Sequence, residues 1–301
     1  MRQGVIDIGS NSVKLLIADC IDGQIHPVKE TSCQTRLGQG LYERSQLQPK
    51  AIEATVESVR NFIRLAEFES VEKLLVIATS AVREANNASH LITAIDQPVS
   101  ILSGDDEAQF SFAGVMTSSH LAEGNLLVVD AGGGSTEFTS GNLTGLDQHI
   151  SISLGSVRLM ESFPVSDDPT TEQLKAVRNS IDTQLQSIVC SDDWKSKSNS
   201  LLVGVGGCAT ILAMMELSIE DFDRTRIEQV ALSVEQVICW SEKLWGLPLS
   251  HRQGIIGLPA NRADVALYSC LIYERILLGL RYEQLWISTR GIRFGALVNN
   301  F

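Results

Sequence analysis

Apolar residues along this chain alternate between short unbroken runs and longer stretches that have the period of a helix. In 48–66, apolar residues at 51, 52, 56, 59, 62, 63 and 66 recur at the spacing of one face of a helix. The run at 74–78 is short and unbroken, which is typical of a strand buried in a parallel sheet. The first third of the chain therefore predicts strands at 5–8, 13–18, 25–32, 74–78 and 99–102, and helices at 48–66, from 79, at 89–95 and from 105.

The second half repeats this plan after a polar region at 117–125, which we interpret as a domain boundary. It predicts strands at 126–130, 137–139, 147–153, 201–205 and 284–288, and helices from 154, at 171–189, around 210–215, at 233–244 and at 263–278. Strands that alternate with helices in both halves predict an α/β fold. A length of 301 residues is enough for two domains, which we expect at 1–122 and 123–301.

Two segments of the chain share one layout, VIDIGSNS at 5–12 and VVDAGGGS at 128–135. In each, an apolar strand leads to an Asp and then to a turn of small residues that ends in a hydroxyl. The aligned pairs are Asp7 with Asp130, Gly9 with Gly132 and Ser12 with Ser135. Each copy then meets a hairpin signal, at 22–23 or 141–142. Such hairpins offer backbone N–H groups and a hydroxyl beside a carboxylate that can hold Mg²⁺. The repeat predicts two related domains facing each other across a phosphate-binding cleft.

The overall charge narrows the class of partner. The formal charge is −12 and no basic stripe offsets it, which argues against nucleic acid as a main partner. A phosphate substrate would need a locally positive pocket and a metal ion. No apolar run approaches the roughly 20 residues of a membrane helix, so no membrane association is expected. The first strand starts within about four residues of the N-terminus, which leaves no room for a signal peptide, and we expect a cytoplasmic protein.

The six cysteines are scattered and form no C-x-x-C pair, which predicts free thiols in a reducing compartment. The five histidines show no metal-ligand spacing, which argues against a zinc site.

Four strand-to-loop junctions carry the residues suited to chemistry: 7–12, 80–83 together with 104–107, 130–135, and 204–207. Ligands of α/β sheets bind beyond the carboxyl ends of strands, so these junctions are expected to converge on one cleft. The motifs at and near them are IDIGSNS at 6–12, ATSAVREA at 78–85, LSGDDEA at 102–108, VDAGGGSTE at 129–137, LGSVRL at 154–159 and VGVGG at 203–207.

As an ordered set, these motifs resemble the exopolyphosphatase and guanosine-pentaphosphate phosphohydrolase (Ppx/GppA) family of the actin, hexokinase and Hsp70-like superfamily. The resemblance implies two ribonuclease-H-like domains flanking an active-site cleft, in a short two-domain form. It also implies Mg²⁺-dependent release of terminal orthophosphate from inorganic polyphosphate. A homodimer is also compatible with the resemblance, and the apolar segment 263–278 could be either core or interface.

The resemblance assigns roles to individual residues. Glu107 matches the catalytic carboxylate and would act as general base toward water. Arg83 would clamp the phosphoryl group through its planar fork. Asp130 and Glu137 match acidic residues around the metal, and Asp7 would share the ion from the opposite domain. The groups expected to bond phosphate oxygens are Asn11, Ser12, Gly132, Gly133, Gly134, Ser135, Gly206 and Gly207.

Some positions leave alternatives or depart from the family pattern. Close packing of a helix on a strand is an equal explanation for Gly206 and Gly207. Arg158 either reaches the substrate or forms a structural ion pair. Cys208 stands where Thr is common, which removes a hydroxyl ligand, and the segment GIRFG at 291–295 carries Phe294 in place of a family Glu.

Three other functions stay open on the sequence. The same site would serve a guanosine pentaphosphate (pppGpp) 5′-phosphohydrolase, and a purine-stacking aromatic at the cleft would favour that substrate. A kinase-type phosphotransferase uses the same fold, although Glu107 in its motif argues against it. A non-catalytic sensor that binds polyphosphate or guanosine penta- or tetraphosphate would use the same pocket. The short length predicts a weaker hold on very long polyphosphate.

Overall fold

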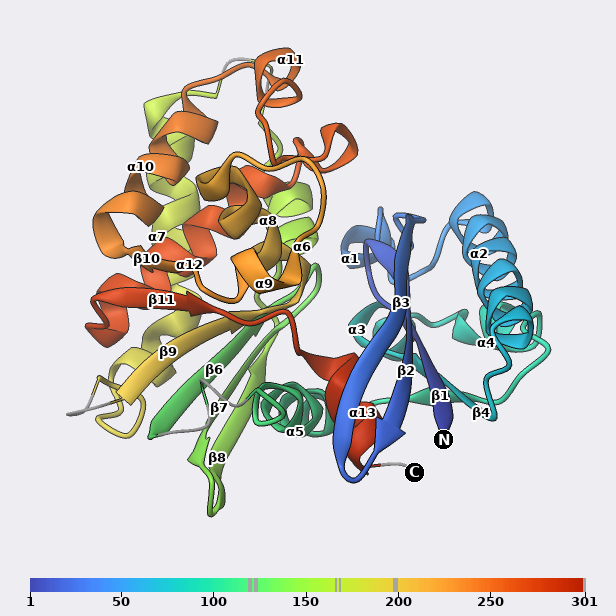
Figure 1. Cartoon of the computed structure of the whole chain (residues 1–301). Coiled ribbons are helices and arrows are strands. Elements are labelled where there is room, and N and C mark those ends of the chain that lie inside the picture. The colour runs from blue at the N-terminus through green and yellow to red at the C-terminus, as the bar shows by residue number, and fades with distance from the viewer. Residues whose placement is uncertain (119–120, 122–123, 166, 168, 197–199, 300–301) are drawn as a thin grey trace.

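The computed structural model describes residues 1–118, 121, 124–165, 167, 169–196 and 200–299, which form two lobes, each built on one sheet (Figure 1). The predicted boundary at 122 and 123 lies on residues outside these ranges.

The first sheet has five strands in the order β3-β2-β1-β4-β5 among the described residues. Its strands are β1 (Arg2–Ile8), β2 (Ser12–Ile21), β3 (Gln24–Gln34), β4 (Lys73–Ala78) and β5 (Val99–Ile101). The first three are antiparallel, and β4 and β5 run parallel to β1. The turn from β2 to β3 lies at Asp22 and Gly23, which both have positive φ as a tight hairpin requires.

Helices cover both faces of the first sheet. On one face lie α1 (Leu41–Arg44), α2 (Pro49–Phe68), α3 (Ser80–Glu84) and α4 (Ala88–Ile92). On the other lie α5 (Gly104–Val115) and α13 (Ile292–Asn299). Figure 1 shows that α13, from the end of the chain, returns to lie beside α5 and the first sheet. The sequence pattern did not predict α13.

The second sheet repeats the plan of the first. Its order is β10-β11-β9-β6-β7-β8, in which β6, β7 and β8 form an antiparallel meander and β9 and β11 run parallel to β6. The strands are β6 (Asn125–Ala131), β7 (Thr136–Asn142), β8 (Gly145–Ile152), β9 (Ser200–Val205), β10 (Ala231–Ser233) and β11 (Gln284–Ile287). The two glycine-containing segments thus occupy equivalent hairpins, β1–β2 and β6–β7. The predicted signal at 141–142 is wrong by two residues, because β7 continues to Asn142 before turning.

The helices of the second lobe pack around a large apolar core. They are α6 (Ser156–Ser162), α7 (Thr171–Val189), α8 (Gly206–Leu217), α9 (Arg224–Ile227), α10 (Val234–Trp245), α11 (Leu249–Arg252), η1 (Ala260–Arg262) and α12 (Ala266–Leu280). Twelve of the fifteen residues of α12 are buried, so this segment is core. Its start falls later than predicted because 260–262 form a 3₁₀ turn. None of the helices in the described part of the chain is long and apolar enough to span a bilayer.

Two glycines allow α5 and α13 to touch. A Cβ at Gly295 would strike the backbone carbonyl of Phe110, and a Cβ at Gly114 would strike that of Gly291. The side chain of Phe294 is fully buried beside this contact. Because α5 also carries Glu107, the glycine contact helps to fix the position of that residue.

We expect Gly295→Ala to lower the free energy of unfolding by about 1–3 kcal/mol, since overpacking outweighs the better helix propensity of Ala. Urea denaturation measures it. Gly254→Ala is the matched control, because its Cβ would meet only the carbonyl of His251 at 3.5 Å. A Gly295→Ala protein as stable as the native one would contradict this account of the helix contact.

Candidate active site

A cleft with a volume of about 510 Å³ lies between the lobes, and all four predicted junctions contribute residues to it, the junction at 80–83 and 104–107 through Ser80 and Glu107. Twelve of the predicted residues line it: Asp7, Asn11, Ser12, Glu107, Asp130, Gly132, Gly133, Gly134, Ser135, Glu137, Gly206 and Gly207. Arg83 differs from them, because it lines a separate pocket beside the cleft and reaches the site only through its ion pair with Glu107.

The two glycine-containing hairpins close in the same way. In the first, the N–H of Gly9 donates to the carbonyl of Ser12 at 3.1 Å; in the second, the N–H of Gly132 donates to that of Ser135 at 2.9 Å. Both hydroxyl side chains are buried at the tips of their turns. The sequence repeat is therefore also a repeat of backbone geometry, with one copy on each side of the cleft.

Two glycines at the cleft, Gly134 and Gly206, are required by close approach, whereas Gly207 is not. A Cβ at Gly134 would collide with the hydroxyls of Tyr42 and Ser80. Gly206 has a φ of +80°, and its Cβ would strike the carboxylate of Asp130. Packing therefore explains Gly206, one of the two explanations left open. A Cβ at Gly207 would meet only the terminal nitrogen atoms of Arg262 and Lys14. The backbone of Gly207 therefore faces the open cleft.

Four carboxyl groups gather around the cleft in a poorly solvated environment. Burial raises the pKa of Asp7 and of Asp130, and the charge of Asp7 raises that of Asp130 further. Burial also raises the pKa of Glu137, to about 7, with the charge of Asp130 as the next cause. Burial, followed by the charge of Glu137, raises the pKa of Glu107 well above its usual value.

The structure fixes the orientation of these carboxylates. Asp130 and Glu137 lie opposite each other on β6 and β7. The hydroxyl of Ser111, one turn along α5 from Glu107, donates to Asp130 Oδ2 at 3.0 Å. The hydroxyl of Ser151 donates to Glu137 Oε1 at 2.7 Å. Asp130 and Glu137 therefore each accept a hydrogen bond from a serine hydroxyl that fixes their orientation.

The cleft also contains cations that the sequence reading did not identify. Lys14 is the register partner of Asp7 on β2 and lowers the pKa values of Asp7 and Asp130. Arg262, from η1, donates to the hydroxyl of Ser12 at 2.5 Å. Arg293, at the start of α13, also lines the cleft. Together they supply the locally positive surface that a polyanion requires in a chain of negative overall charge.

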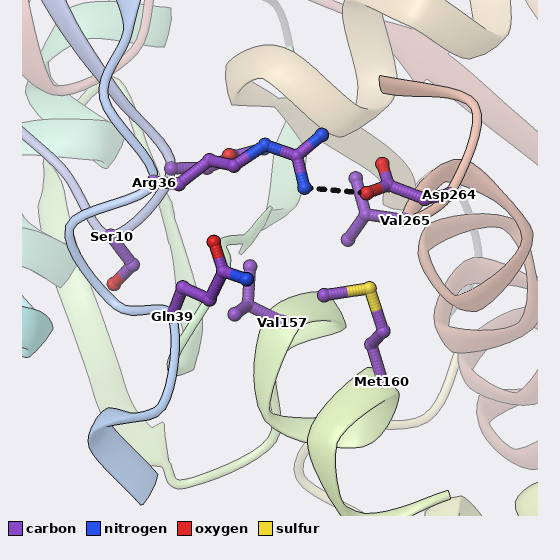
Figure 2. Close-up of a pocket in the computed structure, with 8 residues that line it drawn as sticks. Ser10, Arg36, Gln39, Val157, Met160, Asp264 and Val265 are labelled. Carbon is purple, nitrogen blue, oxygen red and sulfur yellow. Dashed lines mark hydrogen bonds and ion pairs between the residues drawn. The ribbon is translucent and has the colours of Figure 1, made fainter. Parts of the chain in front are cut away.

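Arg262 and Arg293 lie where the lobes meet. Arg293 Nη2 lies 3.1 Å from Glu30 of β3. Near Arg262, the Arg36 guanidinium forms an ion pair with Asp264 at 2.6 Å, beside a small cavity between the lobes (Figure 2). These contacts tie the first lobe to residues far along the chain and hold the lobes together across the cleft.

Arg158 forms a structural ion pair, one of the two alternatives the sequence left. It donates to both carboxylate oxygens of Glu84, at 2.8 and 2.6 Å, and to the carbonyl of Gly134 at 2.9 Å. Its guanidinium also stacks on the ring of Tyr42 at 3.9 Å. Arg158 thus supports the second hairpin from behind.

The predicted metal ligands provide an incomplete coordination shell. Oδ1 of Asp7 is buried and has no hydrogen-bond partner among the described residues, which suits an oxygen that awaits a cation. Within the described ranges, however, no three His, Cys, Asp or Glu side chains converge closely enough to hold a metal ion. Mg²⁺ commonly binds through one or two carboxylates, waters and substrate phosphates, and the residues present fit that arrangement.

Comparison with known proteins decides the family. The pattern that defines the Ppx/GppA phosphatase family matches residues 16–301. The chain belongs to this family. A structure of a Ppx/GppA family member from Aquifex aeolicus is 30% identical over 99% of this chain and 96% of that one, with a TM-score of 0.82. A structure of an exopolyphosphatase from Cytophaga hutchinsonii is 25% identical over 99% of this chain and 96% of that one, with a TM-score of 0.89.

Among curated relatives, Exopolyphosphatase 2 of Mycobacterium tuberculosis is 28% identical over 98% of this chain and 97% of its own length. The bifunctional 3-dehydroquinate synthase/phosphatase of Fusobacterium nucleatum is 30% identical over 90% of this chain, which spans 42% of that protein. These matches confirm the Ppx/GppA resemblance and the two-lobed α/β fold that the motifs predicted.

The raised pKa of Glu137 predicts how stability depends on pH. The usual pKa of 4.5 applies to Glu137 in the unfolded chain. The contribution of protonated Glu137 to the free energy of unfolding is therefore fully present below about pH 4.5 and is lost as the pH rises through about 7. Without divalent cations, Glu137→Gln should therefore be more stable than the native protein at pH 8, by on the order of 3 kcal/mol. At pH 4.5 the two should be nearly equal.

Urea denaturation at both pH values measures this difference. Glu172→Gln is the control, because Glu172 is exposed in the first turn of α7. If Glu137→Gln were no more stable than the native protein at pH 8, Glu137 would not be a strained buried carboxylate.

Proposed function

We propose that this chain is an exopolyphosphatase, which releases terminal orthophosphate from inorganic polyphosphate by attack of water. The observation that carries the proposal is the position of Glu107. This buried carboxyl group of raised pKa lines a cleft flanked by two equivalent glycine-serine hairpins, and a carboxylate of raised basicity is suited to accept a proton from water. The names of the Mycobacterium and Cytophaga relatives support this substrate.

In the proposed reaction, the water oxygen attacks the terminal phosphorus in line with the bridging oxygen. Glu107 takes a proton from the water as the bond to the bridging oxygen breaks, which leaves orthophosphate and a chain shortened by one unit. The N–H groups of Gly132 to Ser135 and the hydroxyl of Ser12 would hold phosphate oxygens. Arg83 would orient Glu107 and meet the transferred phosphoryl group at the edge of the cleft.

We assign Mg²⁺, or another divalent cation, to Asp130, Asp7 and Glu137, with waters and phosphates completing its shell. Such an ion would neutralise phosphate charge and polarise the scissile bond. We also keep the proposal of a cytoplasmic protein, which the cysteines support. All six lie within the described residues and are free thiols, as expected in a reducing compartment.

One observation favours pppGpp as a second substrate. Phe222 lines the cleft and is 48% exposed, so its ring is available to stack on a purine. The sequence alone does not place this aromatic at the cleft. If the nucleotide is a substrate, Phe222→Leu should raise KM for pppGpp and leave polyphosphate hydrolysis nearly unchanged.

The test of the proposed function is orthophosphate release with Mg²⁺ from polyphosphates of several defined lengths and from pppGpp. Turnover of polyphosphate at a kcat/KM above that for pppGpp supports the proposal. The reverse order would assign the protein to the nucleotide. Binding of both without any release would instead identify a sensor.

A further inference from the structure

A second pocket lies directly behind the catalytic carboxylates. It is lined by Arg83, Glu84, Ser103, Gly104, Asp105, Ser135, His149, Ile150, Ser151 and Ser153. The pocket lies between the start of α5 and strand β8, where a Cβ at Gly104 would crowd the side chain of Ser151. Arg83 and Ser135, which have roles in the proposed function, line this pocket together with Ser151, the partner of Glu137.

The wall between this pocket and the cleft contains one residue that lines both spaces and two side-chain contacts that cross it. Ser135 lines both spaces. Arg83, on the pocket side, contacts Glu107 on the cleft side. Ser151, also on the pocket side, donates to Glu137 on the cleft side at 2.7 Å. Three positions along the wall therefore connect the two spaces.

The wall lies where hydrolysis would leave orthophosphate. Glu107 and Glu137 flank the expected position of the terminal phosphorus, while the shortened chain, itself a polyanion, would still fill the cleft toward its mouth. Orthophosphate that left by the cleft would have to wait for that chain to dissociate. Rotation of the Arg83 side chain, which is 27% exposed, would open a shorter path.

The lining of the pocket suits passage of an anion more than its retention. The guanidinium of Arg83 and the hydroxyl of Ser153 are donors for phosphate oxygens, while the hydroxyls of Ser103 and Ser151 already donate to Asp106 and Glu137. Of the two acidic groups, Glu84 is paired with Arg158, and Asp105, whose side chain is 70% exposed, lies 3.4 Å from His149. Donors without a strong net positive charge bind orthophosphate weakly and release it.

We propose that this rear pocket is the exit site for orthophosphate, separate from the cleft by which polyphosphate enters. The proposal rests on the proposed hydrolysis of polyphosphate. It gives the enzyme a way to keep hold of one chain through several cleavages.

The test is to narrow the pocket at Ser153, which is exposed at its rim. For Ser153→Trp, orthophosphate formed in the first turnover, measured after acid quench, should keep its native rate. The steady-state rate of free orthophosphate, followed with a fluorescent phosphate sensor, should fall about fivefold or more because release becomes limiting. Two controls should keep both native rates: Ser153→Ala, which removes only the hydroxyl, and Asp147→Trp, which adds the indole at an exposed position on β8 outside the pocket.

An unchanged steady-state rate for Ser153→Trp would overturn the exit route, and so would an equal loss in the first turnover. A native protein that forms no quenched orthophosphate at all would refute the proposed function, and the exit route with it. A second measurement needs no variant: orthophosphate should inhibit the native enzyme with a noncompetitive component against polyphosphate. Purely competitive inhibition would contradict a separate exit.

Discussion

Glu107→Gln will lower kcat for orthophosphate release by about a hundredfold or more, while polyphosphate still binds. Gln keeps the shape of the side chain and can still accept a hydrogen bond from Arg83, but it cannot take a proton from water. The buried position of Glu107 means that no exposed carboxylate can replace it. Rapid-quench kinetics with saturating polyphosphate and Mg²⁺ give the first-turnover rate, and equilibrium titration gives the affinity.

The matched control is Asp106→Asn, which makes the same change of charge one residue earlier. Asp106 accepts hydrogen bonds from the N–H and the hydroxyl of Ser103 in the N-cap of α5, and Asn retains an acceptor there. This control should keep its activity within about twofold. A Glu107→Gln enzyme that retained more than about a tenth of the native rate would exclude Glu107 as the base.

Asp130→Asn will abolish most of the response to Mg²⁺, lowering kcat/KM by about a hundredfold or more, since a metal contributes several kcal/mol to stabilising the charge of a phosphoryl transition state. The half-buried Asp130 carboxylate carries a raised pKa because removal from water disfavours its charge. Its neutralisation should therefore stabilise the metal-free protein and remove the gain in Tm that Mg²⁺ gives to the native one.

Thermal unfolding with and without Mg²⁺ provides a readout independent of turnover. Asp147→Asn is the control, because Asp147 is exposed on β8. If Mg²⁺ raised the Tm of Asp130→Asn as much as that of the native protein, Asp130 would not belong to the metal site.

Much of the fold could be predicted because its signals are local. The turn at Asp22 and Gly23, the unbroken run of β4 and the Thr170 cap of α7 each depend on a few neighbouring residues. The repeat of the hairpins at Asp7 and Asp130 extended this local information to the two-lobed architecture. The repeat could be recognised in the sequence because phosphate-binding turns need small residues at fixed spacing.

The features that were missed depend on distant parts of the chain. Arg262 reaches Ser12 across 250 residues, and no local pattern marks a 3₁₀ turn as part of a cleft. The return of α13 to the first lobe depends on the glycine contact with α5, which involves residues more than 170 positions apart. Lys14 could have been identified, since strand alternation places it on the same face of β2 as Ser12.

The placement of Arg83 beside the cleft could not be read from the sequence either. Its motif predicted a residue near the phosphate, but α3 turns the side chain toward the space between α5 and β8. Only the three-dimensional arrangement shows that Arg83 faces a second pocket.

Hydrolysis of polyphosphate of one defined length in ¹⁸O-labelled water tests the central claim most directly. If water attacks the terminal phosphorus, each released orthophosphate will carry one ¹⁸O atom, and the remaining chains will be shorter by single units and unlabelled. Label in the remaining chains, or fragments from internal cleavage, would contradict terminal attack by water at this site.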